Sequence, residues 1–276
     1  MTGAAGMLGQ DVVRAAAAAN HEVVPLGHDD LDVRRARRVR EAIGREQPHA
    51  VINCAAWTDV DGAEADEAAA TKINGAAASA VAAAAAEAGA SVVHPSTDYV
   101  FDGTKREPYV ESDPVNPINA YGRSKLAGEH AVAEANPRHF VVRTSWLFGA
   151  GGKNFVETML GLAGDRGHVL VVRDQIGCPT YTAHLAEALV RLIDGESYGL
   201  HHLAGQGECS WYEFAGEIFE QAGVDCRAMS CTSDEFPRPA TRPAYSVLRT
   251  QRDYGLLLPD WREGLAAYLA ERAVAR

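Results

Sequence analysis

The run Gly3-Ala-Ala-Gly6-Met-Leu-Gly9, close to the start of the chain, is the stretch that decides the fold. Glycines at this spacing let the backbone turn tightly and approach a ligand closely. The helix expected after Leu8 would then offer its first backbone N–H groups to a bound pyrophosphate. On its own the spacing is also typical of a generic glycine turn. The segments that follow it make a dinucleotide-binding turn the better interpretation, with Gly3, Gly6, Met7 and Leu8 as candidate cofactor contacts.

Short apolar segments alternate with alanine-rich segments of helical period behind this turn. This alternation predicts an α/β fold with a doubly wound, Rossmann-like parallel sheet that is covered on both faces. We expect residues 1–148 to form the dinucleotide-binding domain. Residues 149–276 would form a smaller, mainly substrate-binding lobe, with segments that cross back to the sheet. Strands are predicted at residues 22–26, 50–54, 91–94, 140–143 and 169–173, and helices at 10–19, 36–45, 63–88, 121–135, 183–194 and 211–222.

One feature conflicts with this fold, because only Met1 and Thr2 precede the glycine turn. The first strand of a doubly wound sheet is central, and here it is expected to be truncated, which should expose its neighbours and weaken the support of the turn. A valine GTG codon inside that strand, used as the initiator for Met1, would produce this arrangement. The intact mass of the native protein tests whether Met1 is the true start.

Composition and charge exclude several classes of protein. The net charge of -11 disfavours non-specific binding to nucleic acid or to an anionic membrane. No apolar run reaches the ~20 residues of a membrane span, and no basic region followed by an apolar stretch marks a secretory signal. The five cysteines are scattered without zinc-site spacing, so they predict reduced thiols in a cytoplasmic enzyme that has no metal site of its own.

Tyr121 and Lys125 are the strongest catalytic candidates. Four residues apart on a predicted helix, they lie on one face with ~6 Å of rise between them. An ammonium group so close should favour the phenolate and lower the pKa of the tyrosine, which suits proton exchange with a carbonyl group. An exposed helix pair is the alternative. Thr97, which follows a predicted strand where a hydroxyl could bind the same carbonyl, favours the catalytic interpretation.

The cofactor-binding candidates lie after the other predicted strands. Asn53, Ala55 and Ala56 form an Asn-x-Ala-x turn of the type that lies along a dinucleotide. An acidic group for the adenosine ribose is expected about 20 residues after the glycine turn, and Asp29, Asp30 and Asp32 are its candidates. No clear arginine follows the second strand to bind a 2′-phosphate, and His28 is the nearest candidate. The choice between NAD and NADP therefore stays open.

Taken together, these motifs resemble the extended short-chain dehydrogenase/reductases and, among them, the dTDP-4-dehydrorhamnose reductase family. The departures are the missing first strand and a poorly matching loop at residues 27–38. The matching stretches cover the chain in order: Thr2-Gly-Ala-Ala-Gly-Met-Leu-Gly9, Val51-Ile-Asn-Cys-Ala-Ala-Trp-Thr-Asp-Val-Asp61, Ser96-Thr-Asp-Tyr-Val-Phe-Asp-Gly103, Pro117-Ile-Asn-Ala-Tyr-Gly-Arg-Ser-Lys-Leu-Ala-Gly-Glu129, Val142-Arg-Thr-Ser-Trp-Leu-Phe-Gly149, Asn154-Phe155, Val172-Arg-Asp-Gln-Ile-Gly-Cys-Pro-Thr180 and Arg242-Pro-Ala-Tyr-Ser-Val-Leu248.

The resemblance implies reduction of the C4 ketone of dTDP-4-dehydro-6-deoxy-L-mannose by NADPH, with NADH as the alternative. In this interpretation Tyr121 protonates the C4 oxygen, Lys125 holds the nicotinamide ribose and Thr97 orients the carbonyl. Trp146, Asn154 and Arg242 would face the dTDP-sugar. Their alternatives are a core aromatic, a helix cap and a surface arginine.

The resemblance leaves the oligomer, the metal and the exact sugar open. Some family members dimerise around Mg²⁺ held by acidic residues, so a homodimer is one expectation; Asp11 and Glu208 are candidate ligands, with plain surface charge as the alternative. A dehydratase is disfavoured because Asp98 is followed by Tyr99 and not by a second acid. A sibling ketosugar reductase of the dihydrostreptose type remains an alternative. A non-catalytic subunit resembling the regulatory subunit of methionine adenosyltransferase is the other.

Overall fold

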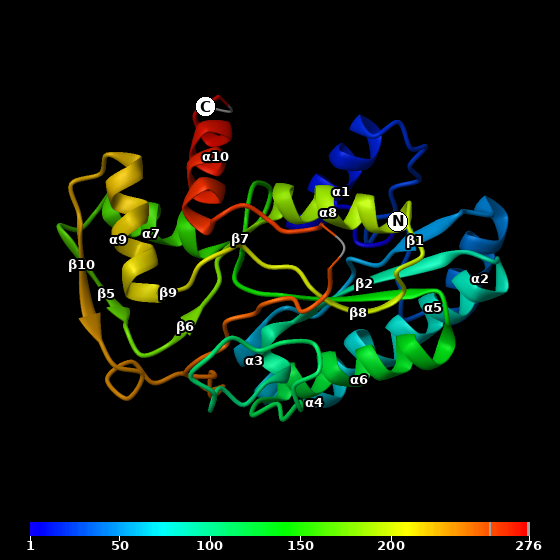
Figure 1. Cartoon of the computed structure of the whole chain (residues 1–276), viewed down its shortest axis with the longest axis horizontal. Coiled ribbons are helices and arrows are strands. Elements are labelled where there is room, and N and C mark those ends of the chain that lie inside the picture. Colours follow the sequence, from blue (N-terminus) through cyan, green and yellow to red (C-terminus); the bar gives the residue numbers. More distant parts are fainter. Residues whose placement is uncertain (254, 275–276) are drawn as a thin grey trace.

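Four parallel strands form the main sheet of the computed structural model, which describes residues 1–253 and 255–274 (Figure 1). The strand order is β1-β2-β3-β8, and every pairing is parallel. The two central strands are almost entirely buried, as expected for a sheet covered on both faces. The predicted α/β class with a doubly wound parallel sheet is therefore confirmed. The strands are β1 (Ala50–Ile52), β2 (Ser91–Thr97), β3 (His139–Thr144) and β8 (Gly199–His202).

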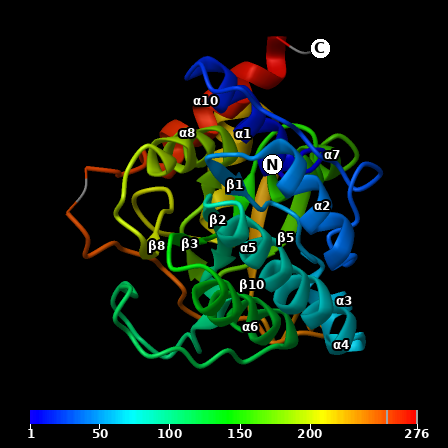
Figure 2. The same cartoon turned by 90° about the vertical axis from the view of Figure 1, so that its right-hand side faces the viewer.

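Helices cover the two faces of this sheet (Figure 2). α1 (Met7–Ala18) and α8 (Thr182–Ile193) pack together on one face, whereas α2 (Ala36–Glu46), α5 (Ala78–Glu87) and α6 (Ala120–Ala135) cover the other. Successive strand residues point to opposite faces. Accordingly, Val93 packs in the cluster that contains α8, and its neighbour Val92 packs in the cluster that contains α5.

At the N-terminus, Thr2 lies where a further parallel strand would run. It bridges Leu26 on one side and Asn53 on the other. The strand predicted at residues 22–26 is not formed beyond the bridge between Leu26 and Thr2. The Leu26 N–H donates to the Met1 carbonyl oxygen at 2.9 Å, and Val24 remains 36% exposed.

The single helix predicted at residues 63–88 is wrong, because Asp66 interrupts it and the first helix begins earlier, directly after Asp59. Asp59 and Asp66 each accept a hydrogen bond from a backbone N–H three residues ahead, so each caps a new helix. Asp66 itself has a non-helical backbone (φ −146°, ψ 73°). The segment consists of α3 (Val60–Ala65), α4 (Glu67–Thr71), a π-helical turn (Lys72–Ala77) and α5.

The second half of the chain builds a smaller body beside the sheet and also returns to it. β8 and α8 belong to the main sheet and its cover, although both follow residue 149. Elsewhere Phe148 and Phe214 lie at the centre of a separate apolar cluster. No helix in the two described ranges is long and apolar enough to cross a membrane. The remaining elements are a 3₁₀ turn (Asp98–Val100), β4 (Leu147–Phe148), α7 (Phe155–Ala163), β5 (His168–Val172), β6 (Ile176–Gly177), β7 (Thr180–Tyr181), β9 (Cys209–Ser210), α9 (Trp211–Ala222), β10 (Arg227–Cys231) and α10 (Trp261–Val274).

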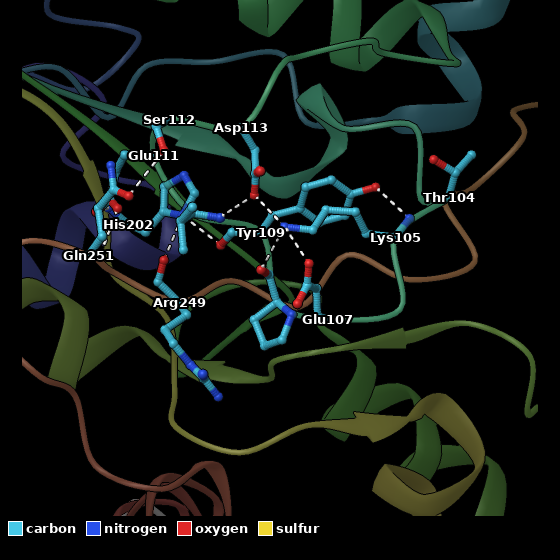
Figure 3. A network of polar contacts seen from close by, with 12 residues as sticks. Thr104, Lys105, Glu107, Tyr109, Glu111, Ser112, Asp113, His202, Arg249 and Gln251 are labelled. Carbon is cyan, nitrogen blue, oxygen red and sulfur yellow. Dashed lines mark hydrogen bonds and ion pairs between the residues drawn. The ribbon is translucent and has the colours of Figure 1, made fainter.

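A polar network ties the loop after the 3₁₀ turn to the returning chain near residues 247–251 (Figure 3). The Glu111 carboxylate accepts from the His202 N–H at 2.9 Å, the Thr250 hydroxyl at 2.6 Å and the Gln251 N–H at 2.9 Å. The His202 Nδ1 atom lies 3.2 Å from the Tyr109 carbonyl oxygen and 3.1 Å from that of Arg249. This network anchors the chain just beyond Arg242 and Ser246, two residues of the candidate site described below.

The network should make the protein sensitive to acid. Burial lowers the pKa of His202 from 6.5 to about 4. Between these two pH values, His202 is therefore protonated in the unfolded chain and neutral in the folded protein. His202 therefore contributes stability that is present above pH 6.5 and is lost as the pH falls towards 4, by at most about 1.4 kcal/mol per pH unit. In urea titrations, His202→Asn should flatten the fall of the unfolding free energy in this window. His130→Asn, at an exposed position, should leave the slope unchanged; equal slopes for all three proteins would contradict the prediction.

Candidate active site

The glycine turn has the geometry of a pyrophosphate cradle. Gly3 has a left-handed backbone (φ +69°), and a Cβ atom there would lie 2.5 Å from the Ala55 backbone nitrogen. At Gly9 a Cβ atom would lie 2.2 Å from the Gly3 carbonyl oxygen, so only glycine lets α1 approach the turn so closely. α1 begins at Met7 with no side chain capping it, which leaves its first N–H groups for an anion.

A cavity of about 420 Å³ opens beside this turn, at the edge of the sheet where the Thr2 bridge and β1 end. This is the edge at which open α/β sheets bind nucleotides. The lining combines the predicted glycines, the Asn-x-Ala-x turn and the acidic loop: Gly3, Ala5, Gly6, His28, Leu31, Asp32, Val33, Arg34, Cys54, Ala55, Ala56 and Ile73. Of the three aspartates left open by the sequence, Asp32 is the one that lines the cavity. Arg34, which the sequence analysis missed, lies beside it.

Five of the predicted cofactor residues lie outside this lining, and two of them, Tyr121 and Lys125, are described with the catalytic candidates below. Leu8 is buried in the apolar cluster under α1. The buried Asn53 amide accepts from the Thr2 hydroxyl at 2.7 Å and lies 3.3 Å from His94, so it holds Thr2 against the sheet. Met7 contacts Asn154 through its sulfur atom. These contacts give the three side chains packing roles, and the neighbouring backbone reaches the cavity.

Tyr121 and Thr97 are brought together by a close contact between α6 and the end of β2. Asn119 caps α6 by accepting from the Gly122 N–H at 2.7 Å, which places Tyr121 in the first turn. A Cβ atom on Gly122 would lie 2.1 Å from the Tyr99 carbonyl oxygen, so the helix rests directly on the turn after Thr97. The Thr97 hydroxyl donates to Asp98 at 3.1 Å and lies close enough to the Tyr121 hydroxyl to lower the pKa of that phenol.

Burial, however, raises the pKa of Tyr121 to about 12, and this effect outweighs the opposite effect of Thr97 on the same pKa. The structure does not bear out the prediction that Lys125 lowers this pKa. The Lys125 ammonium donates instead to the Pro95 carbonyl oxygen at 2.7 Å, and burial lowers its own pKa to about 8. Tyr121 is therefore a protonated phenol at neutral pH, which is the form that can donate a proton to a carbonyl oxygen.

Asp98 is a buried acid at this site that the sequence analysis did not assign to it. Burial raises its pKa to about 7. Its carboxyl group accepts from the Ser246 hydroxyl at 2.5 Å and from the Thr97 hydroxyl at 3.1 Å. Its adjacency to Thr97 is the one sequence signal that could have indicated this position. Because Ser246 lies on the returning chain, Asp98 joins the catalytic turn to the smaller lobe.

Arg242 also comes from the returning chain, and it is mostly buried and not a free surface arginine. Its guanidinium donates to Asp61 at 2.6 Å and to the Ala240 carbonyl oxygen at 2.6 Å. It also interacts with Tyr99, which lies edge-on to Tyr121 with 6.0 Å between the ring centroids. The Tyr99 ring therefore lies between Arg242 and the candidate catalytic tyrosine, Tyr121.

Trp146 and Asn154 lie where the sheet meets the smaller lobe. Trp146 has a left-handed backbone (φ 47°) and stacks on Trp211 with 3.5 Å between centroids. A left-handed conformation is uncommon for a bulky residue and is frequent at functional sites. The Asn154 side-chain oxygen, Oδ1, accepts from the Glu157 N–H at 3.0 Å, and the side-chain Nδ2 donates to the Gly149 carbonyl oxygen at 2.8 Å. The alternative interpretation of Asn154, as a helix cap, is therefore confirmed.

The two candidate magnesium ligands lie apart and are occupied. Asp11 is paired with Arg14, and Glu208 accepts from the Tyr245 hydroxyl at 2.8 Å. Within residues 1–253 and 255–274, no group of three or more His, Cys, Asp or Glu side chains could hold a metal ion.

Comparisons with known proteins agree with this geometry. The chain is 43% identical to a dTDP-4-dehydrorhamnose reductase of Burkholderia thailandensis, with 95% of this chain and 94% of that protein covered. It is 45% identical to a probable dTDP-4,6-dihydroxy-2-methyloxan-3-one 4-ketoreductase of Streptomyces antibioticus, over 96% of this chain and 92% of that protein. A crystal structure of the Bacillus anthracis dTDP-4-dehydrorhamnose reductase in complex with NADP superposes with a TM-score of 0.94 at 40% identity, covering 98% and 97% of the two chains.

The family model described as the RmlD substrate binding domain matches residues 1–274, which is almost the whole sequence. This match runs through the glycine turn, the Thr97 and Tyr121 pair and the returning chain alike. The chain therefore belongs to the RmlD substrate binding domain family.

Proposed function

We propose that this protein reduces the C4 ketone of dTDP-4-dehydro-6-deoxy-L-mannose with NADPH and forms dTDP-L-rhamnose. The observation that carries the proposal is the protonated Tyr121 hydroxyl, held against Thr97 at the carboxyl end of β2. This end lies next to β1, whose following residues line the dinucleotide cavity. A buried proton donor beside a hydride-carrying cofactor is the arrangement that carbonyl reduction requires.

NADPH would supply the hydride that adds to C4 of the sugar. The carbon–oxygen double bond opens as the hydride arrives, and the phenolic proton of Tyr121 passes to the oxygen. The Thr97 hydroxyl orients that oxygen by a hydrogen bond. Lys125, buried one turn further along α6, would hold the nicotinamide ribose.

The substrate would lie between the catalytic turn and the smaller lobe. Arg242 is suited to a diphosphate because a guanidinium group can donate two parallel hydrogen bonds to it. Trp146 offers a large aromatic surface that is already rigid through its stack on Trp211. Asn154 has the weakest support as a substrate contact, because its side-chain oxygen caps α7 and its amide nitrogen donates to the carbonyl oxygens of Gly149 and Gly152.

A sibling 4-ketoreductase is the second candidate, because the Streptomyces relative named for that activity is as similar as the rhamnose enzymes. Both activities share the hydride donor and the tyrosine acid, and they differ in the sugar. A purely regulatory role has no comparable support, since the catalytic groups are intact and assembled.

The deciding experiment follows NADPH oxidation at 340 nm with dTDP-4-dehydro-L-rhamnose and, separately, with dTDP-4,6-dihydroxy-2-methyloxan-3-one, the sugar nucleotide named for the Streptomyces relative. Turnover with the first and identification of dTDP-L-rhamnose by NMR would establish the proposal. Turnover with the second alone would assign the sibling activity. A folded protein that binds NADPH and reduces neither sugar would contradict both.

A further inference from the structure

The Thr97 hydroxyl has a single hydrogen, and two acceptors compete for it. A threonine hydroxyl offers one donor and two acceptor positions. In the structure, the Thr97 oxygen accepts from the Tyr99 N–H at 3.2 Å and lies 3.1 Å from Oδ1 of Asp98. If Asp98 were an anion, the Thr97 hydrogen would be directed to it. The same hydrogen would then be lost to the sugar carbonyl that Thr97 is proposed to orient.

The surroundings of Asp98 favour its neutral form. The residue is 2% exposed, and no ion pair joins it to a cation in the described ranges. The hydrogen bonds from Ser246 and Thr97 favour the anion, but burial is the larger effect and opposes it. A buried carboxyl group without a cation releases its proton less readily than one in water.

The titratable groups that face Asp98 are neutral around pH 7. They come from the 3₁₀ turn, from α6 and from the segment after β6, and burial raises the pKa of each: Tyr99, Tyr121 and Cys178. The two cations of the site have other partners. Lys125 donates to Pro95, and Arg242 interacts with Asp61 and with Tyr99. Within this cluster, Asp98 is therefore the group whose charge changes at neutral pH.

We propose that Asp98 is a neutral acid in the active enzyme and donates its proton in a hydrogen bond to the Thr97 oxygen, so that the Thr97 hydrogen is free for the C4 oxygen of the sugar. The 3.1 Å between the two oxygens allows this direction as well as the reverse. The Ser246 hydroxyl donates to Oδ2 at 2.5 Å, so the acid proton belongs on Oδ1, the oxygen that faces Thr97.

The hydrogen bonds of the threonine then have one arrangement. With the Tyr99 N–H and the Asp98 O–H both donating to it, the Thr97 oxygen has no acceptor position left, and the hydroxyl can act only as a donor. Such a donor stabilises the negative charge that develops on the C4 oxygen as the hydride arrives. Asp98 keeps its proton throughout, and Tyr121 supplies the one that the product gains. Asp98 is therefore a positioning residue that acts through Thr97, and this inference rests on the proposed function.

The pH dependence of kcat/KM for the sugar, measured at saturating NADPH, tests the inference. The native protein should be fully active below pH 7 and should lose up to about tenfold per pH unit as the pH rises through the Asp98 pKa of about 7. Asp98→Asn should stay within about threefold of the native value at pH 6, because its amide nitrogen can donate to Thr97 while its oxygen accepts from Ser246. The fall near pH 7 should be absent in this variant, whereas a fall near pH 8 from Lys125 would remain. Asp225→Asn, at an exposed position, is the matched control and should follow the native profile.

A second variant and a spectroscopic measurement complete the test. The Ser246 hydrogen bond lowers the pKa of Asp98, so Ser246→Ala should move the fall in kcat/KM to a higher pH. Infrared difference spectra of the native protein against Asp98→Asn need neither sugar nor coenzyme. The carbonyl stretch of a protonated carboxyl group should be strong at pH 6 and weak above about pH 8.

Three results would overturn the inference. A native pH profile in Asp98→Asn would assign the titration to another group. A folded Asp98→Asn that is inactive at every pH would show that the site needs the carboxylate, and a missing carboxyl stretch at pH 6 would show that Asp98 is ionised there. If Asp98→Asn did not fold, an unchanged profile in Ser246→Ala would decide against the inference. In each case, turnover by the native protein leaves the proposed function standing, whereas a folded native protein that reduces neither sugar contradicts both.

Discussion

Replacing Tyr121 by phenylalanine is expected to lower kcat for ketosugar reduction by a factor of about 10² to 10⁴, the range in which a positioned general acid acts. The variant keeps the ring, which lies edge-on to Tyr99, and removes only the hydroxyl. Without this hydroxyl, the C4 oxygen has no proton donor. In the described part of the chain, no other phenol interacts with Thr97. Steady-state NADPH oxidation measures the effect.

The matched control for this variant is Tyr198→Phe. Its hydroxyl accepts from Arg138 at the far side of the sheet and has no part in the proposed chemistry, so kcat should stay within about twofold. NADPH binding by Tyr121→Phe, followed by fluorescence, should remain close to that of the native protein. If Tyr121→Phe retained full kcat with intact binding, the proton would have to come from another group, and the buried Asp98 would be examined next.

Replacing Arg143 by methionine is expected to lower the unfolding free energy by about 3–5 kcal/mol, the usual effect of leaving one charge of a buried pair without its partner. Arg143 donates to Glu129 from Nε at 2.9 Å and from Nη2 at 2.7 Å, and both side chains are almost fully buried. The guanidinium also lies over the Phe101 ring, 5.1 Å from its centroid. Urea titration followed by tryptophan fluorescence measures the change.

A double variant separates the pair from simple loss of packing. Arg143→Met combined with Glu129→Leu removes both charges, and it should recover most of the lost stability, because an apolar pair of similar volume is often as stable as a buried ion pair. The Ser96 hydroxyl, which donates to Glu129 at 2.5 Å, loses its acceptor and limits the recovery by about 1 kcal/mol. A double variant as unstable as the single one would show that the side-chain shapes, and not the unpaired charge, decide the effect.

The fold was predictable where the hydrophobic period is long and undivided. The strands at residues 91–97 and 139–144 and the helix at 120–135 lie within a few residues of their predicted places, since their buried faces follow one period. The prediction failed at residues 22–26, because a strand needs a partner and only Thr2 provides one. It failed again at residues 63–88, where the capping contact of Asp66 interrupts a run whose composition is uniformly helical.

The site was predictable in its residue types and less so in its contacts. The spacing of Tyr121 and Lys125 indicated a shared helix face. It could not reveal that the Lys125 ammonium group donates to Pro95, or that burial has the largest effect on the pKa of Tyr121. Arg34 was missed because its pairing with Asp32 depends on a loop conformation that no period encodes. The Asp98 carboxyl group accepts a hydrogen bond from Ser246, a residue 148 positions away. A contact of this kind leaves no local signal in the sequence.

That long-range contact has a consequence for when the enzyme becomes active during synthesis. A ribosome has released the candidate catalytic threonine, tyrosine and lysine long before it adds Ser246 and Arg242, whose partners Asp98 and Asp61 lie 148 and 181 positions earlier. The sheet around β2 and β3 can collapse early, because these two strands follow one another in the sheet and in the sequence, whereas contacts of such separation form late and slow the last step. On the proposed function, a nascent chain of about 240 residues would hold the proposed acid and still lack Arg242 and Ser246, so that activity would appear only after this late segment has been added.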